Sequence, residues 1–192
     1  MAILEIKKFP DKILKEKAAP VTEFDTTLQR LIDDMIETMY ASFGVGLAAN
    51  QVGVSQRVIV IDVSWQEGHP LVILINPEII HSAGADRREE GCLSIPGFKT
   101  VVKRAERVRV AGIDRHGKPV EIEGNGLLGR ALQHEIDHLN GILMIDRIGR
   151  IKREFFKRRY MKVSTRHYRD TKKRRHSESR FFWHTAICHS LT

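Results

Sequence analysis

Apolar residues in the first quarter of the chain recur at helical spacing. They are Leu28, Leu31, Ile32, Met35, Ile36, Met39 and Tyr40. Neighbours three or four positions apart share one helix face, so this spacing predicts an amphipathic helix over about 26–42 whose methionines lie in the core. Asp25 stands at the expected N-cap position, and Gly44 and Gly46 end the pattern.

The middle of the chain consists of short apolar stretches separated by turn signals. The stretches cover residues 57–63, 71–75, 100–103, 106–113 and 120–123. Several are rich in β-branched residues, and runs of this length bounded by turns predict strands.

Helical spacing returns at about residue 126 and ends at Asn140-Gly141, a common C-terminal signal. A last helix is predicted over about 147–162, with Ile148, Ile151 and Phe155 on one face and basic residues around the rest. Strands flanked by helices, without regular βαβ alternation, predict an α+β fold. In that fold, short antiparallel or mixed strands pack around the 126–139 helix, with one helix before them and a basic helix after.

A length of 192 residues suits one domain with an appendage, which we place at 1–163 and 164–192. Whether the appendage is ordered stays open. No apolar run approaches the roughly 18 residues that cross a bilayer. Lys7 and Lys8 interrupt the place where a secretory signal needs its apolar stretch. We therefore expect a cytoplasmic protein without a membrane span.

The net charge of +8 is unevenly distributed. From residue 147 onward there are 15 Lys and Arg residues against 3 Asp and Glu residues, so this part carries about +12 and residues 1–146 carry about −4. A basic block on a mildly acidic body favours contact with a polyanion. The alternative is a block that is simply solvated.

The strongest local motif is His134-Glu135-Ile136-Asp137-His138, which has the H-E-x-x-H pattern and falls within a predicted helix. Residues four apart lie one turn apart on the same face, so both imidazoles can reach one ion while Glu135 stands beside it as a proton carrier. This arrangement is typical of metal-dependent hydrolases. The alternative is a polar helix turn without a metal.

Cys92 is the candidate third ligand. The other cysteine, Cys188, is far away in the chain, and two cysteines of this kind indicate no disulfide framework. A thiolate with two imidazoles leaves one coordination position for water, whose pKa then falls toward neutrality. Taken alone, a cysteine between Gly and Leu is more often a small buried hydrophobic residue, and the histidine pair is what favours a ligand.

A segment of small residues runs from Gly44 to Gln51. It lacks both glycine-rich phosphate-binding motifs, so we expect no nucleotide cofactor. Its small side chains let a substrate or a metal site approach the backbone, and the Gln51 amide can donate to an oxyanion. A tight corner between a helix and a strand is the alternative.

Together, three segments resemble the signature motifs of bacterial peptide deformylase. They are Gly44-x-Gly46-x-Ala48-Ala49-x-Gln51, Glu90-Gly91-Cys92-Leu93-Ser94 and Gln133-His134-Glu135-x-Asp137-His138-Leu139-x-Gly141. The resemblance covers about residues 1–160. It implies an α+β metalloenzyme that removes the formyl group from the initiator methionine of nascent polypeptides and releases formate.

The resemblance also implies a role for each matching residue. Cys92, His134 and His138 bind the metal, and a metal-bound water attacks the formyl carbon with Glu135 as general base and then general acid. The Gln51 amide and the Leu93 backbone N–H stabilise the oxyanion.

The remaining substrate-binding positions that the resemblance implies are Val45, Gly46, Gly91, Leu127, Ala131 and the ring of His134. Val45, Gly46 and Gly91 would pair with the peptide backbone, and Val45, Leu127, Ala131 and His134 would line the methionine pocket. Glu90 and Arg104 are expected to form a pair that steadies the cysteine loop.

The ligand types suit Fe²⁺, Zn²⁺, Ni²⁺ or Co²⁺, and only the resemblance favours Fe²⁺. The basic helix at 147–162 resembles the family's ribosome-docking helix, which makes the ribosome the expected polyanion. Two alternatives stay open at this point. One is a metallopeptidase that cuts ordinary amides, and the other is a nucleic-acid-binding protein with a structural metal.

Overall fold

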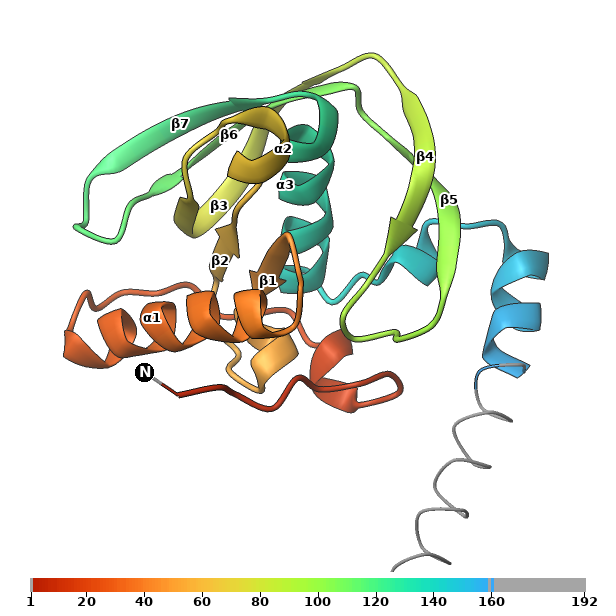
Figure 1. Ribbon diagram of the computed structural model, residues 1–192, viewed down its shortest axis with the longest axis horizontal. Coiled ribbons are helices and arrows are strands. Elements are labelled where there is room, and N and C mark those ends of the chain that lie inside the picture. The colour runs from red at the N-terminus through yellow and green to blue at the C-terminus, as the bar shows by residue number, and fades with distance from the viewer. Residues whose placement is uncertain (1, 159, 161–192) are drawn as a thin grey trace, which may run out of the picture. The chain divides into compact units, whose positions relative to one another are not determined.

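The structure is a computed structural model that describes residues 2–158 and 160 (Figure 1). The chain divides into two units, with the boundary between Ile148 and Gly149. The predicted boundary between residues 163 and 164 lies outside the described residues and stays a prediction. Among the described residues, no helix is both long and apolar enough to cross a membrane.

A five-stranded sheet forms the centre of the first unit. Its strands are β1 (Gly46–Ala48), β2 (Val58–Ile61), β3 (Val72–Ala83), β6 (Arg107–Ile113) and β7 (Pro119–Gly124). They lie in the order β1-β2-β3-β6-β7, and each neighbouring pair is antiparallel. β1 is therefore an edge strand.

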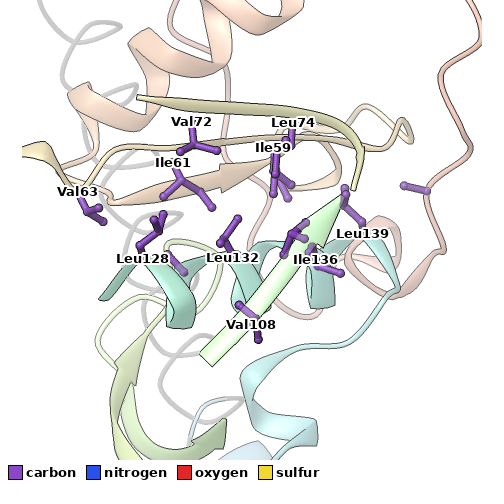
Figure 2. Close-up of a cluster of buried hydrophobic side chains, with 14 residues drawn as sticks. Ile59, Ile61, Val63, Val72, Leu74, Val108, Leu128, Leu132, Ile136 and Leu139 are labelled. Atoms are coloured by element: carbon purple, nitrogen blue, oxygen red, sulfur yellow. The ribbon is translucent and has the colours of Figure 1, made fainter. Parts of the chain in front are cut away.

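Helix α3 (Gly126–Leu139) packs on the sheet through four apolar residues at helical spacing, Leu128, Leu132, Ile136 and Leu139. Figure 2 shows them facing Ile59 and Ile61 of β2, with Val72 and Leu74 of β3 beside these. Because removing apolar surface from water is the main driving force of folding, this contact holds α3 firmly against the sheet.

Helix α1 (Thr26–Ala41) contributes to a second apolar cluster. Its Ile32, Met35 and Met39 are fully buried and belong to the same cluster as Val58 and Val60 of β2. Successive strand residues point to opposite faces, so β2, buried at all four positions, is covered by α3 on one side and α1 on the other.

Shorter elements complete the first unit. They are the 3₁₀ turns at Lys12–Lys15, Ala49–Val52 and Met144–Asp146, the four-residue helix α2 (Ser64–Glu67), and the hairpin of β4 (Asp86–Gly91) and β5 (Lys99–Arg104). The hairpin is a separate two-stranded sheet. Its strand β4 ends immediately before Cys92.

The α+β fold class is confirmed, with helices α1 and α3 and strands β2, β5, β6 and β7 close to their predicted bounds. Asp25 caps α1 by accepting from the Leu28 N–H at 2.8 Å. The end of β3 is a correction: it continues beyond the predicted residue 75 to Ala83, past Pro77 and a break in register between Ile75 and Glu78.

In the second unit, residues 150–158 are helical, so the helix begins three residues later than predicted. Its predicted apolar face is wrong in part, because Ile151 and Phe155 are exposed. Phe156 is buried instead, and its ring packs against that of Tyr160 one turn later. The predicted end near residue 162 lies outside the described residues.

Candidate metal centre and substrate cavity

Cys92, His134 and His138 converge on one point. The two histidines lie one turn apart on α3, and Cys92 follows β4. One donor atom from each of the three lies within 4.8 Å of the others. Cys92 Sγ is 3.2 Å from Nε2 of His138.

A buried carboxylate orients the first histidine. Nδ1 of His134 donates to Oε2 of Glu90 at 3.1 Å, which fixes the ring and leaves Nε2 for an ion. Glu90 also accepts two hydrogen bonds from Arg104, at 2.9 and 3.0 Å, and one from Arg130 at 2.6 Å. The predicted Glu90–Arg104 pair is thus present, and Arg104 extends it to Asp137 on α3.

The surroundings of this cluster shift its protonation equilibria. Burial raises the pKa of Glu90, but the hydrogen bonds from His134 and Arg104 outweigh burial and hold it well below its usual range. Burial, with the positive charges of His134 and Arg104, lowers the pKa of His138 well below its usual value. His138 is therefore neutral, which is the form that binds metals.

The donor set fits a divalent transition-metal ion. One thiolate and two imidazoles are ligands of catalytic zinc-type sites, in which three protein ligands leave a position for solvent. Burial lowers the pKa of His134, yet its hydrogen bonds to Cys92 and Glu90 raise it well above the ordinary value. Cys92 and Glu90 thus favour a positive charge on the His134 ring.

Glu135 is the acid–base group next to these ligands. Its side chain is buried, and Oε2 has no hydrogen-bond partner within residues 2–158 and 160. Burial raises the pKa of Glu135 to about 7, against the lowering effect of the charges of His134 and Arg104. A carboxyl group with this pKa can both accept and release a proton near neutral pH.

A cavity of about 960 Å³ opens beside the cluster. Ten of the eleven residues predicted for the site line it: Val45, Gly46, Gln51, Gly91, Cys92, Leu93, Leu127, Ala131, His134 and Glu135. The eleventh, His138, does not line the cavity, but its Nε2 atom lies 3.2 Å from Sγ of Cys92, which does. The structure therefore brings all of these residues together around one space.

Gln51 is held rigidly in the 3₁₀ turn after β1. Its Oε1 accepts from the Ala48 N–H at 2.8 Å, and its Nε2 donates to Ser94 Oγ at 3.2 Å. The same Nε2 lies 3.8 Å from Cys92 Sγ. A side-chain N–H donor is thereby fixed beside the ligand set.

Sequence reasoning missed the role of two basic residues in the cavity wall. Nζ of Lys8 donates to the Leu93 carbonyl at 2.7 Å, and burial lowers the pKa of Lys8. Nothing in the sequence relates Lys8 to Leu93. Arg130 binds Glu90 and Asp86. Its position one turn before His134 places it on the same face of α3, and this spacing could have predicted its role.

Comparisons with known proteins agree on one family. The family model described as Polypeptide deformylase matches residues 3–154. A peptide deformylase of Thermodesulfovibrio yellowstonii is 60% identical over 161 residues, covering 83% of this chain and 98% of that protein. One of Syntrophobacter fumaroxidans is 54% identical over 163 residues, covering 84% and 96%.

Solved structures agree as well. A peptide deformylase of Legionella pneumophila superposes with a TM-score of 0.81 at 48% identity, covering 88% of this chain and 99% of that one. One of Synechococcus elongatus, in complex with actinonin, has a TM-score of 0.75 at 41% identity, covering 80% and 84%. The chain therefore belongs to the peptide deformylase family, whose members are metal-dependent hydrolases that remove the N-formyl group from nascent polypeptides.

Proposed function

We propose that this chain hydrolyses the formyl amide of the initiator methionine, with Cys92, His134 and His138 holding one divalent ion and Glu135 moving the proton. The observation that carries the proposal is the position of Glu135, a buried carboxyl group with a raised pKa beside the ligand set at the wall of the cavity. The reaction consumes one water and yields formate and a free amine.

An ion at this place supplies Lewis acidity and makes water acidic enough to react near neutral pH. Glu135 accepts the proton that the attacking water loses and passes it to the amine nitrogen as the C–N bond breaks. The Gln51 amide and the Leu93 backbone N–H donate to the oxygen that gains negative charge. The rigid hold on Gln51 supports this role, because a fixed donor needs no reorganisation during the reaction.

The methionine side chain would occupy the part of the cavity lined by Val45, Leu127, Ala131 and the ring of His134. The peptide backbone would lie beside Val45 and Gly46 at the edge strand β1, with Gly91 on the opposite side. An edge strand has backbone groups available for an added strand, which supports this mode of binding.

We propose Fe²⁺ as the native ion, with Zn²⁺, Ni²⁺ or Co²⁺ as substitutes. A thiolate and two imidazoles bind all four ions, so the ligand types do not select one of them. Only the family resemblance favours iron. Elemental analysis of protein purified without oxygen tests this assignment. About one iron per chain is expected, and stoichiometric zinc in its place would contradict it.

We also propose that the basic helix binds the ribosome and that the protein works in the cytoplasm, where nascent polypeptides emerge. Within residues 150–158, five Lys and Arg residues accompany one acidic residue, Glu154. Contacts of such residues with phosphates release counterions, so binding should weaken steeply with salt. Cosedimentation with ribosomes at low and high salt, with Lys152→Glu/Lys157→Glu as the weakened variant, is the test. Salt-independent binding would contradict it.

Formate release from formyl-Met-Ala-Ser tests the enzymatic proposal. The anaerobic wild-type protein should release formate, while acetyl-Met-Ala-Ser and the free-amine peptide should stay intact. Glu135→Gln should keep its metal and lose about 10²–10⁴-fold in kcat. Cleavage of the free-amine peptide would instead indicate a metallopeptidase, and near wild-type turnover by Glu135→Gln would remove Glu135 from the mechanism.

A further inference from the structure

The loop between α1 and β1 places a phenylalanine where a helix end normally has glycine. The Phe43 N–H donates to the Tyr40 carbonyl at 3.0 Å, and the Gly44 N–H donates to the Met39 carbonyl at 2.9 Å. This pair of hydrogen bonds is the Schellman ending of a helix, which requires a left-handed residue at the Phe43 position. Phe43 adopts that conformation with φ of 54°.

Phe43 is unfavourable for the fold in two respects. A β-carbon is disfavoured in the left-handed region, where glycine is the usual residue. Phe43 is also 97% exposed, so its side chain adds almost nothing to the core. A residue that is both conformationally strained and exposed suggests a function at the place where it stands.

That place is the wall of the substrate cavity. Phe43, Gly44, Val45 and Gly46 line it consecutively. The inner end of this wall is at Glu135, because Gly46 lies directly against the Glu135 side chain. Phe43 lies three residues before Gly46 in the chain and lines the same cavity, beyond Gly44 and Val45.

We infer that Phe43 is a specificity-determining residue that contacts the third residue of the formylated peptide; this inference rests on the proposed function. A peptide whose formyl group is at Glu135 and whose backbone runs outward beside β1 advances about 3.4 Å per residue. Its methionine lies near Val45, and its third residue reaches Phe43. An exposed aromatic ring favours an apolar partner, so peptides with a large apolar third residue are preferred substrates.

The test compares kcat/KM for formyl-Met-Ala-Leu amide and formyl-Met-Ala-Ser amide. For the wild-type protein we expect a leucine-to-serine ratio of about 3 to 10, the value of a partly buried apolar contact. Phe43→Gly should bring the leucine-to-serine ratio close to 1. Phe43→Leu keeps an apolar side chain and should have a ratio close to that of the wild type. Phe43→Gly relieves the left-handed strain, so the variant should fold at least as well as the wild type.

Trp65→Ser is the matched control, because Trp65 is also an exposed aromatic residue, at 73%, but does not line the cavity. This variant should keep the wild-type ratio.

A wild-type ratio near 1, or an unchanged ratio in Phe43→Gly, would overturn the inference while leaving the proposed function intact. A change of oligomeric state in Phe43→Gly with an unchanged ratio would make Phe43 a contact between copies and would also overturn it. Absence of formate release from every peptide would overturn the proposed function itself, and the inference with it.

Discussion

Gly46 lies so close to Glu135 that a β-carbon at position 46 would stand 2.6 Å from the Glu135 Oε1 atom. Strand β1 and helix α3 therefore meet without a side chain between them, and the absence of one allows Glu135 to take its place at the cavity. This contact joins the first and third sequence motifs.

Gly46→Ala should displace the Glu135 carboxylate and lower kcat by about 10²-fold, the cost of misplacing a reacting group by about 1 Å. The ligands do not depend on Gly46, so metal content should stay at the wild-type level. Gly149→Ala is the control, because nothing lies within 4 Å of a β-carbon at that position. Wild-type turnover by Gly46→Ala would show that Glu135 is not the positioned base.

The Glu90 carboxylate makes stability depend on pH. Its pKa lies well below the ordinary value of 4.5 in the folded protein, so the unfolded chain takes up a proton at a pH where the folded protein does not. This contribution is complete above pH 4.5 and is lost as the pH falls below that value toward the folded pKa.

Glu90→Gln removes this titration and takes from the buried Arg104 one of its two ionic partners, leaving Asp137. The variant should therefore cost about 3 kcal/mol at pH 7, the low end for a broken buried ion pair. Urea unfolding of metal-free protein at pH 7 and pH 3 measures the effect. The difference in the free energy of unfolding between wild type and variant should be smaller at pH 3 than at pH 7, because only the wild type loses the contribution of Glu90. A constant difference would contradict the assignment.

Glu67 caps α3 from a distance of 60 residues. Its two carboxylate oxygens accept from the backbone N–H groups of Leu127 and Leu128, at 2.7 and 3.1 Å. Glu67→Ala should therefore lower the free energy of unfolding by about 1 kcal/mol. Glu23→Ala, which removes another exposed carboxylate, should change it by less than about 0.5 kcal/mol. Equal effects in the two variants would refute the capping role.

Cys92→Ala should remove metal from the protein. Loss of the thiolate leaves two imidazoles on α3, too few to hold a transition-metal ion tightly. Elemental analysis should find well below one ion per chain, with the far-ultraviolet circular dichroism unchanged. A stoichiometric ion in Cys92→Ala would mean that another residue completes the site.

The two long helices were predictable because their burial repeats along the sequence. Helix α1 presents Leu28, Ile32 and Met35 to the core at the spacing of one helix face, and α3 does the same. Strand β4 was missed because its residues, Asp86 to Gly91, are nearly all charged and give no apolar alternation. Its one buried residue, Glu90, is tolerated only because Arg104 and Arg130 neutralise it.

The residues of the candidate site could be predicted from sequence motifs, whereas the contacts that hold them in place could not. Three short motifs place Cys92, His134 and Glu135 together, as the structure does. The contacts of Lys8 with Leu93 and of Glu67 with α3 join positions 85 and 60 residues apart. Such pairs depend on tertiary packing, and no local pattern in a single sequence identifies them.

Arg104 binds both Glu90, two residues before Cys92, and Asp137, the neighbour of His138. The two segments that supply the ligands are thus tied together by the polypeptide itself. We expect the unloaded protein to keep its native architecture, so that metal uptake follows folding and is reversible. Which ion occupies the protein would then depend on the supply in its surroundings, and an oxidised or lost ion could be replaced without refolding the chain.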